Sequence, residues 1–234
     1  MNPLLLPIVA VQGMVVRSRT EVLPEATGPT TGSTGDGPDP LRLGVLGEST
    51  AAGVGADNHD EGITGRLAQE LAARSGRDVT WEVVGRNAAT ARRIRHRLLP
   101  ELRGTFDVTV LLAGVNDVLG RRSAREWGED VAAVVDDLAG RSERVLMTGI
   151  PPFDVFPALP GTLGRFLAEH AAKLDAVSRE VCAARPQATW ISSTEILHRE
   201  VERSGPDFFA RDRFHPSALG YHRWAEAITE HLVP

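Results

Sequence analysis

Three side chains that together could perform acyl transfer lie in two short segments of the chain. A serine hydroxyl becomes an effective nucleophile when a neutral imidazole removes its proton, and the imidazole needs a carboxylate that fixes its tautomer. Ser49 lies in the segment Gly-Glu-Ser-Thr at 47–50, and Asp212 precedes His215 by three residues. An acid at that spacing can reach the histidine within one local turn, so Asp212 and His215 are candidates to activate Ser49.

The other histidines offer weaker partners for a serine. His198 also has an acid three residues before it, Glu195, but this pair lies in the highly charged stretch 195–203, which is typical of a solvated helix face. The remaining histidines have no acid at that position and are expected at the surface or in helices: His59, His96, His170, His222 and His231.

Asn116, in the segment 114–117, could stabilise negative charge. An asparagine amide that points into the same crevice as Ser49 would donate to a developing oxyanion. Taken alone, Asn116 followed by an aspartate is typical of a turn, and Ser49 alone is compatible with a turn or a helix cap. The serine segment is neither the G-x-S-x-G elbow of α/β-hydrolases nor a P-loop, because Ala51 stands where a glycine would be needed and no Gly-Lys-Ser/Thr follows.

The elements that must position these residues alternate between strands and helices. Helical patterns occupy about 63–71, 91–99, 163–184 and 217–232, and a capping box at Ser123 and Glu126 begins another helix. Parallel strands need such crossover helices, so we expect a parallel sheet with helices on both faces and the active site beyond the carboxyl ends of its strands. Five apolar runs predict the strands: 41–46, 79–84, 108–112, 145–148 and 189–192.

Length and composition favour one α/β domain, at 41–234, preceded by two shorter segments. A chain of 234 residues is long enough for one sizeable core. Residues 24–40 are nearly all Pro, Gly, Thr, Ser and Asp, which predicts a linker or an irregular surface loop.

A net charge of -5 argues against nucleic acid as a partner, and the single Cys182 excludes an intramolecular disulfide.

The first 23 residues contain an apolar run that predicts an arm or helix laid on the domain surface. The run has no Lys or Arg ahead of it and no A-x-A cleavage site after it, so it makes a poor signal peptide. Pro7, Gln12 and Gly13 interrupt it, and it falls short of the roughly 20 apolar residues of a spanning helix. We expect a cytoplasmic protein, with membrane association through this arm as the alternative.

Taken together, the blocks at Ser49, Asn116 and 212–215 resemble those of the GDSL-type lipase/acylhydrolases, the SGNH hydrolase family. The resemblance covers about 41–232. It implies a flavodoxin-like three-layer α/β/α sandwich with a five-stranded parallel sheet. It also implies that Ser49 is the nucleophile, that Asp212 and His215 complete its triad, and that the oxyanion hole consists of the N–H groups of Ser49 and Ala88 and the amide of Asn116.

Two positions depart from the family pattern. Glu48 stands where the family has an aspartate before the serine, which lengthens a supporting acid by one methylene. Ala88, in the segment 84–90, stands where the family has a glycine. An alanine keeps the backbone N–H, so this donor survives if the local backbone angles accommodate a Cβ.

The resemblance implies a serine esterase or lipase that cleaves carboxylic esters or thioesters through an acyl-enzyme, without a metal or organic cofactor. The loop 151–160 could wall an acyl pocket or merely cap the core. The substrate therefore stays open among small-molecule and lipid esters. Alternatives are an acyltransferase, a carbohydrate O-acetylesterase of the same family, and a non-catalytic binding module on the same fold.

Overall fold

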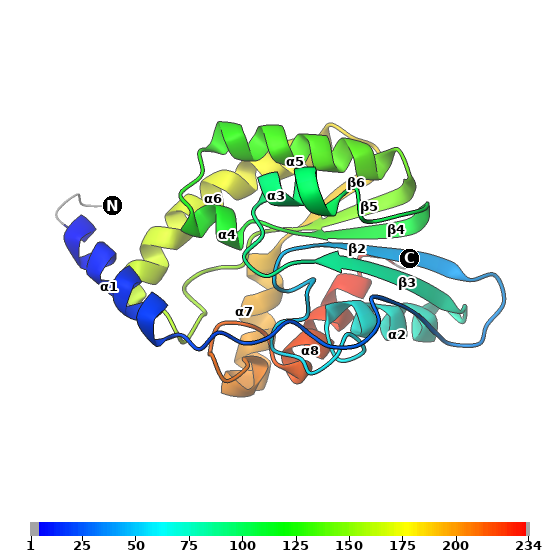
Figure 1. Ribbon diagram of the computed structural model, residues 1–234, viewed down its shortest axis with the longest axis horizontal. Coiled ribbons are helices and arrows are strands. Elements are labelled where there is room, and N and C mark those ends of the chain that lie inside the picture. The colour runs from blue at the N-terminus through cyan, green and yellow to red at the C-terminus, as the bar shows by residue number, and fades with distance from the viewer. Residues whose placement is uncertain (1–4, 233–234) are drawn as a thin grey trace.

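The computed structural model describes residues 5–232, and these fold around a single sheet of six strands (Figure 1). The strand order is β1-β3-β2-β4-β5-β6, and every neighbouring pair is parallel except β1 with β3. The strands are β1 (Thr31–Thr34), β2 (Leu41–Gly47), β3 (Val79–Gly85), β4 (Phe106–Leu112), β5 (Ser142–Thr148) and β6 (Ala188–Ile191).

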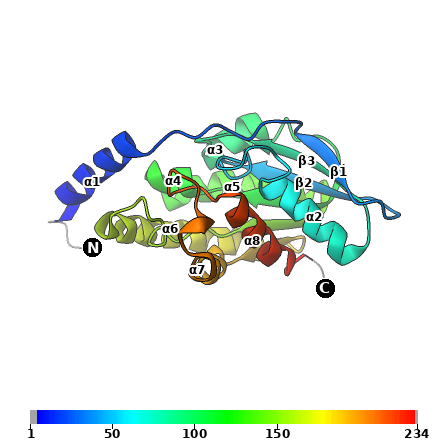
Figure 2. The same cartoon turned by 90° about the horizontal axis from the view of Figure 1, so that it is seen from below.

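Helices cover both faces of the sheet, so the α/β/α arrangement is confirmed. One face carries α3 (Ala91–Arg93), α5 (Ala124–Ala139) and α6 (Gly161–Ala183). The other carries α2 (Ile63–Ser75), α7 (Ser193–Ser204) and α8 (Ala218–Thr229), which Figure 2 shows in front of the sheet. The central strand β4 is buried along nearly its whole length, and its mostly apolar sequence, interrupted by Thr109, is typical of a strand covered on both faces.

Across the sheet the five parallel strands lie in the order β3-β2-β4-β5-β6. Numbered from one to five along the chain, this order is 2-1-3-4-5, so the direction in which strands are added changes beside β2. The chain leaves β2 to form β3 on one side and returns to form β4 on the other. In open sheets of this kind ligands bind at that switch point, outside the carboxyl ends of the strands. The ends of β2 and β4 are therefore the expected place for a site.

The prediction of a linker or irregular loop at 24–40 is wrong for its central part, because Thr31–Thr34 form the edge strand β1. This strand pairs antiparallel with β3, with Thr31 opposite Glu82. An edge strand is held by backbone hydrogen bonds and can face water, so it does not need the apolar side chains by which the sequence reveals a buried strand. The sheet consequently has six strands where the sequence predicts five.

Helix α1 (Leu6–Arg19) is the expected surface helix of the N-terminal arm, and it lies beside α6 (Figures 1 and 2). Val9 is buried, whereas the outer side of the helix exposes apolar side chains. None of the helices in the described range is long and apolar enough to cross a membrane. Membrane association and a cytoplasmic location stay predictions. The exposed apolar residues of α1 are Leu6, Ile8, Val11, Met14 and Val15.

Two short elements escape the sequence analysis and one predicted helix has a different form. A helix of five residues, α4 (Val115–Leu119), follows β4, and a 3-10 helix spans Gly205–Phe208. The helix expected at 91–99 consists of α3 followed by a π-helical turn at Ile94–Leu98. His59, expected at the surface or in a helix, is buried in the loop before α2.

Candidate active site

The ends of β2 and β4 bring Ser49 and Asn116 to the same edge of the sheet. Gly47 lies opposite Leu112 in the register of the two strands, and the N–H of Glu48 donates to the carbonyl of Leu112 at 3.0 Å. A Cβ on Gly47 would lie 2.2 Å from that carbonyl oxygen, so only glycine allows this close approach. The segments that follow the two strands are thereby held side by side.

Ser49, His215 and Asp212 form one chain of hydrogen bonds. The distance from Ser49 Oγ to His215 Nε2 is 3.0 Å, and the distance from His215 Nδ1 to Asp212 Oδ2 is 2.6 Å. Asp212 is buried and His215 is partly buried. Both distances lie within the range in which a base can take a proton from a nucleophile and an acid can orient the base.

The turn at 212–215 fixes the carboxylate through the backbone. Asp212 Oδ1 accepts the N–H groups of Phe214 and His215, each at 3.0 Å, and Arg213 between them has a positive φ of 60°. Burial alone would raise the pKa of Asp212, but the hydrogen bond from the His215 ring and those from the backbone outweigh it and lower the pKa. The carboxylate is therefore ionised and can stabilise a charged imidazole.

The backbone N–H groups of Ser49 and Ala88 donate to no acceptor among the described residues. Ala88 has a φ of 58°, in the left-handed region that glycine enters freely and alanine enters at a cost. The backbone angle explains why the resembling family has a glycine at this position. The sequence leaves open whether the backbone angles at position 88 accommodate a Cβ. In the structure the backbone keeps the glycine-like conformation with alanine present.

The amide of Asn116 is held by two acceptors. Its Nδ2 donates to Glu48 Oε2 at 2.7 Å and to the carbonyl of Ala89 at 3.1 Å. Glu48 also accepts the backbone N–H groups of Val115 and Asn116, at 3.1 and 3.2 Å. Glu48 thus binds both the first turn of α4 and the side chain of Asn116. The sequence analysis identifies Glu48 only as a supporting acid and does not predict these contacts.

Glu48 is buried, and burial raises its pKa from 4.5 to about 7, although its hydrogen bonds from Asn116 and Val115 act in the opposite direction. Asp117, which the sequence analysis gives no role, is buried beside it, and desolvation raises its pKa from 3.8 to about 6. Asp117 accepts the N–H of Ala91 at 2.8 Å and lies 3.6 Å from Arg122. It therefore fixes the start of α3 against α4.

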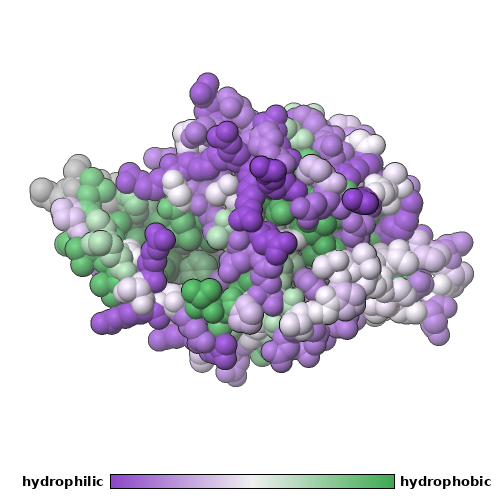
Figure 3. All heavy atoms as spheres, in the orientation of Figure 1, coloured by the Kyte–Doolittle hydropathy of each residue, from purple (hydrophilic) through white to green (hydrophobic). Residues whose placement is uncertain are grey.

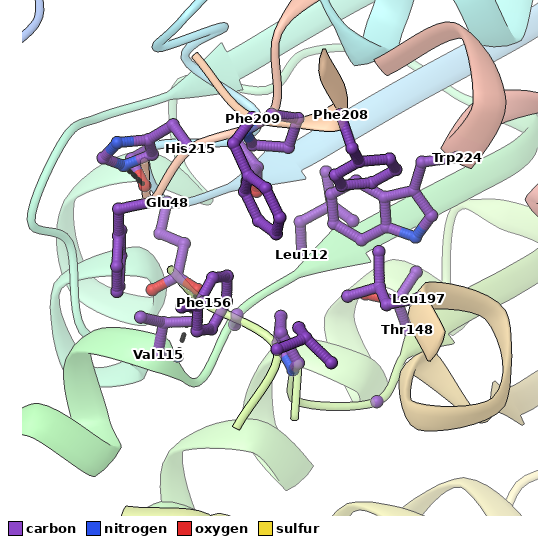
Figure 4. Close-up of a pocket in the computed structure, with 18 residues that line it drawn as sticks. Glu48, Leu112, Val115, Thr148, Phe156, Leu197, Phe208, Phe209, His215 and Trp224 are labelled. Atoms are coloured by element: carbon purple, nitrogen blue, oxygen red, sulfur yellow. Dashed lines mark hydrogen bonds between the residues drawn. The ribbon is translucent and has the colours of Figure 1, made fainter. Parts of the chain in front are cut away.

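Two cavities of different size meet the catalytic side chains. A groove of about 910 Å³, here called the α1 groove, lies between α1 and the body of the domain and includes Ser49, Ala88, Asn116 and His215 in its lining. A second cavity of only about 40 Å³ also includes Ser49 and His215 in its lining. Its walls are largely apolar and include several aromatic rings, of which Figure 4 labels Phe156, Phe208, Phe209 and Trp224.

The loop 151–160 contributes both to the core and to the walls of the cavities beside Ser49. Phe153 is fully buried in the core. Phe156 lines the small cavity and stacks on Phe214 with 4.6 Å between the ring centroids, which fixes the residue next to His215. Leu159 lines the α1 groove. The loop therefore caps the core with one aromatic ring and walls the site with its later residues.

Among residues 5–232, the structure brings together one group of possible metal ligands that the sequence analysis did not predict. Glu70 on α2 and His222 and Glu226 on α8 have ligand atoms within 4.8 Å of one another. His222 makes ion-pair contacts with both acids, at 4.0 and 3.7 Å. None of the three lines either cavity beside Ser49.

His198 lies on the exposed side of α7, 3.7 Å from Asp154.

We predict that Ala88→Gly raises the free energy of unfolding by up to about 1 kcal/mol. The left-handed conformation costs alanine roughly 1–2 kcal/mol, and the greater freedom of glycine in the unfolded chain offsets part of the relief. Because the N–H stays in place, kcat should change less than about tenfold. Chemical denaturation and ester kinetics measure both quantities, with Ala89→Gly as a stability control. If Ala88→Gly lowered the free energy of unfolding by more than about 1 kcal/mol, the backbone of Ala88 would not be strained.

We also predict that Glu48→Gln removes a pH dependence of stability. The pKa of Glu48 is higher in the folded protein, about 7, than its ordinary 4.5. The folded state therefore retains this proton longer, and the contribution of Glu48 to stability falls as pH rises from about 4.5 to about 7, by at most roughly 3 kcal/mol. Glutamine cannot ionise, so the wild type should lose stability relative to the variant over this range.

The measurement for Glu48 is the free energy of unfolding of both proteins at a series of pH values from 4.5 to 8. Glu143→Gln, at an exposed glutamate, is the matched control and should keep the slope of the wild type. A difference between Glu48→Gln and the wild type that does not change with pH would show that folding does not raise the pKa of Glu48.

Comparisons with known proteins agree with this fold and family. A family model described as the GDSL-like Lipase/Acylhydrolase family matches residues 45–223. A search of curated protein sequences finds no match. Among solved structures, the protein TesA has a TM-score of 0.64 at 21% identity, covering 82% of this chain and 97% of its own.

Two further structures share the fold at low sequence identity. The lipase/acylhydrolase from Enterococcus faecalis has a TM-score of 0.61 at 20% identity, covering 82% of this chain and 95% of its own. The acetylxylan esterase from Geobacillus stearothermophilus has a TM-score of 0.57 at 14% identity, covering 82% and 94%. Because the family model spans most of the chain, the protein belongs to the GDSL-like lipase/acylhydrolase family.

Proposed function

We propose that the protein is a serine esterase that cleaves carboxylic esters or thioesters through an acyl-enzyme on Ser49. The observation that carries this proposal is the hydrogen-bonded chain from Ser49 through His215 to Asp212, with distances of 3.0 and 2.6 Å. Ser49 and His215 line a groove that is large enough for a substrate. Membership of a hydrolase family supports the same reaction class.

In the first step, His215 Nε2 takes the proton of Ser49 Oγ while the oxygen attacks the ester carbonyl. A tetrahedral intermediate forms, and the charge on its oxygen is stabilised by the N–H groups of Ser49 and Ala88. His215 then donates the proton to the leaving alcohol or thiol as the bond to the acyl carbon breaks. Asp212 keeps the imidazole oriented and stabilises its transient positive charge.

In the second step, water attacks the acyl-enzyme, and His215 takes a proton from the water and returns it to Ser49 Oγ as the acid is released. Asn116 can join the oxyanion hole only by exchanging one of its two present acceptors, the carbonyl of Ala89 or Glu48 Oε2, for the oxyanion. The longer bond, to Ala89 at 3.1 Å, is the weaker of the two.

The alternatives within the family differ in what enters or leaves the same site. An acyltransferase would use an alcohol in place of water at the second step, and an O-acetylesterase would release acetate from a sugar. The apolar walls of both cavities favour an aliphatic substrate over a polar carbohydrate. Product analysis with and without an added alcohol separates hydrolysis from acyl transfer.

We predict hydrolysis of p-nitrophenyl butanoate that EDTA does not inhibit, because no step of this mechanism uses a metal. Ser49→Ala and His215→Ala should each lower kcat by at least about 10³-fold. His96→Ala, at an exposed histidine outside both cavities, is the control and should keep wild-type rates. Inhibition by EDTA that added metal reverses, or a Ser49→Ala variant with wild-type kcat, would overturn the proposal.

A further inference from the structure

The α1 groove is built in part by a segment that the family match does not include. Its volume of about 910 Å³ lies within the range of roughly 300–1,000 Å³ that is typical of small-molecule sites. Val9, Gly13 and Val16 of α1 form one wall, whereas the family model begins at residue 45. Figure 3 shows the apolar surface of α1 beside the hollow of this groove. The wall is therefore a feature of this chain beyond the matched family region.

The opposite wall of the α1 groove is apolar as well. Leu163, Phe166 and Leu167 of α6 face the groove, and Leu119 at the end of α4 lines it beside the catalytic residues. Charged side chains in the lining are confined to exposed positions, among them Arg17 and Arg121. Such walls offer few hydrogen bonds to a sugar, but they stabilise a hydrocarbon chain, because each CH₂ group that packs against them leaves water.

The small aromatic cavity cannot hold such a chain, because its volume is only about 40 Å³, whereas the α1 groove is more than twenty times larger. The acyl part of a substrate stays bonded to Ser49 through both steps of the mechanism, while the alcohol leaves after the first. A groove that continues from Ser49 between two apolar walls therefore suits the acyl part. We propose that the α1 groove binds the acyl chain and that the natural substrate is an ester or thioester of a medium- or long-chain fatty acid.

This inference rests on the proposed esterase function, and Gly13 provides a direct test of it. A Cβ built on Gly13 meets no atom within 4 Å, and the residue lines the groove. In the variant Gly13→Phe the added ring would project from α1 into the groove and narrow it. Any other residue except proline favours a helix more than glycine does, so the substitution should not weaken α1.

The experiment measures kcat/KM for p-nitrophenyl butanoate and p-nitrophenyl dodecanoate below their aggregation limits. We expect the wild type to prefer the dodecanoate by about tenfold or more, and Gly13→Phe to lower the dodecanoate-to-butanoate ratio by about tenfold or more. Met14→Phe is the matched control, because Met14 is the next residue of the same helix, is exposed and does not line the groove. Equal ratios in all three proteins would overturn the inference.

Esters with the long chain on the alcohol test which part of the substrate occupies the groove. A preference for dodecyl acetate over butyl acetate that Gly13→Phe abolishes, with no preference in the acyl series, would place the alcohol there and overturn the acyl assignment. A melting temperature for Gly13→Phe within a few degrees of the wild type is the control for folding. If that variant unfolds, Leu119→Trp blocks the groove from the opposite wall, where Leu119 is 47% exposed.

A binding measurement separates this inference from the proposed function. Dansylated undecanoic acid should bind Ser49→Ala, which keeps the groove but lacks the nucleophile, and should bind the double variant Ser49→Ala/Gly13→Phe at least about tenfold more weakly. Binding of this kind without ester hydrolysis by the wild type would support the groove and refute the esterase. Hydrolysis of butanoate without binding of the probe would support the esterase and refute the acyl-chain site.

Discussion

The buried carboxylate of Glu48 is the interaction on which the geometry of the site depends. It lies at the end of β2, next to Ser49, and accepts the first two N–H groups of α4 and the amide of Asn116. A buried acid is stable only when such donors surround it. The same bonds that satisfy Glu48 therefore hold α4 and Asn116 beside Ser49 at the edge of the sheet.

The sequence predicts the parts of the site whose chemistry needs particular residue types at a local spacing. Asp212 and His215 can be paired from the sequence because one turn joins them, and the structure brings them to Ser49 as expected. The contacts of Glu48 with Asn116 could not be predicted, because residues far apart in the chain meet only through the pairing of β2 with β4. The positive φ of Ala88 likewise carries no signal in an alanine.

The fold shows the same division between local pattern and long-range packing. Five parallel strands and the helices between them follow from apolar runs and helical spacing, because buried elements must be apolar. The edge strand β1 is held by backbone hydrogen bonds to β3 and has no apolar run, so composition alone predicts a linker there. The apolar residues 4–16 predict a surface helix, but not that α1 and α6 enclose a groove that reaches Ser49.

The central claim is that His215 activates Ser49 as a nucleophile, and covalent labelling by a fluorophosphonate tests it most directly. The probe reports the nucleophile without any assumption about the natural ester. The account predicts that the wild type gains one adduct by intact mass, that peptide mapping places it on Ser49, and that His215→Ala slows labelling by at least about 10²-fold. An adduct on another residue, or labelling of His215→Ala at the wild-type rate, would contradict it.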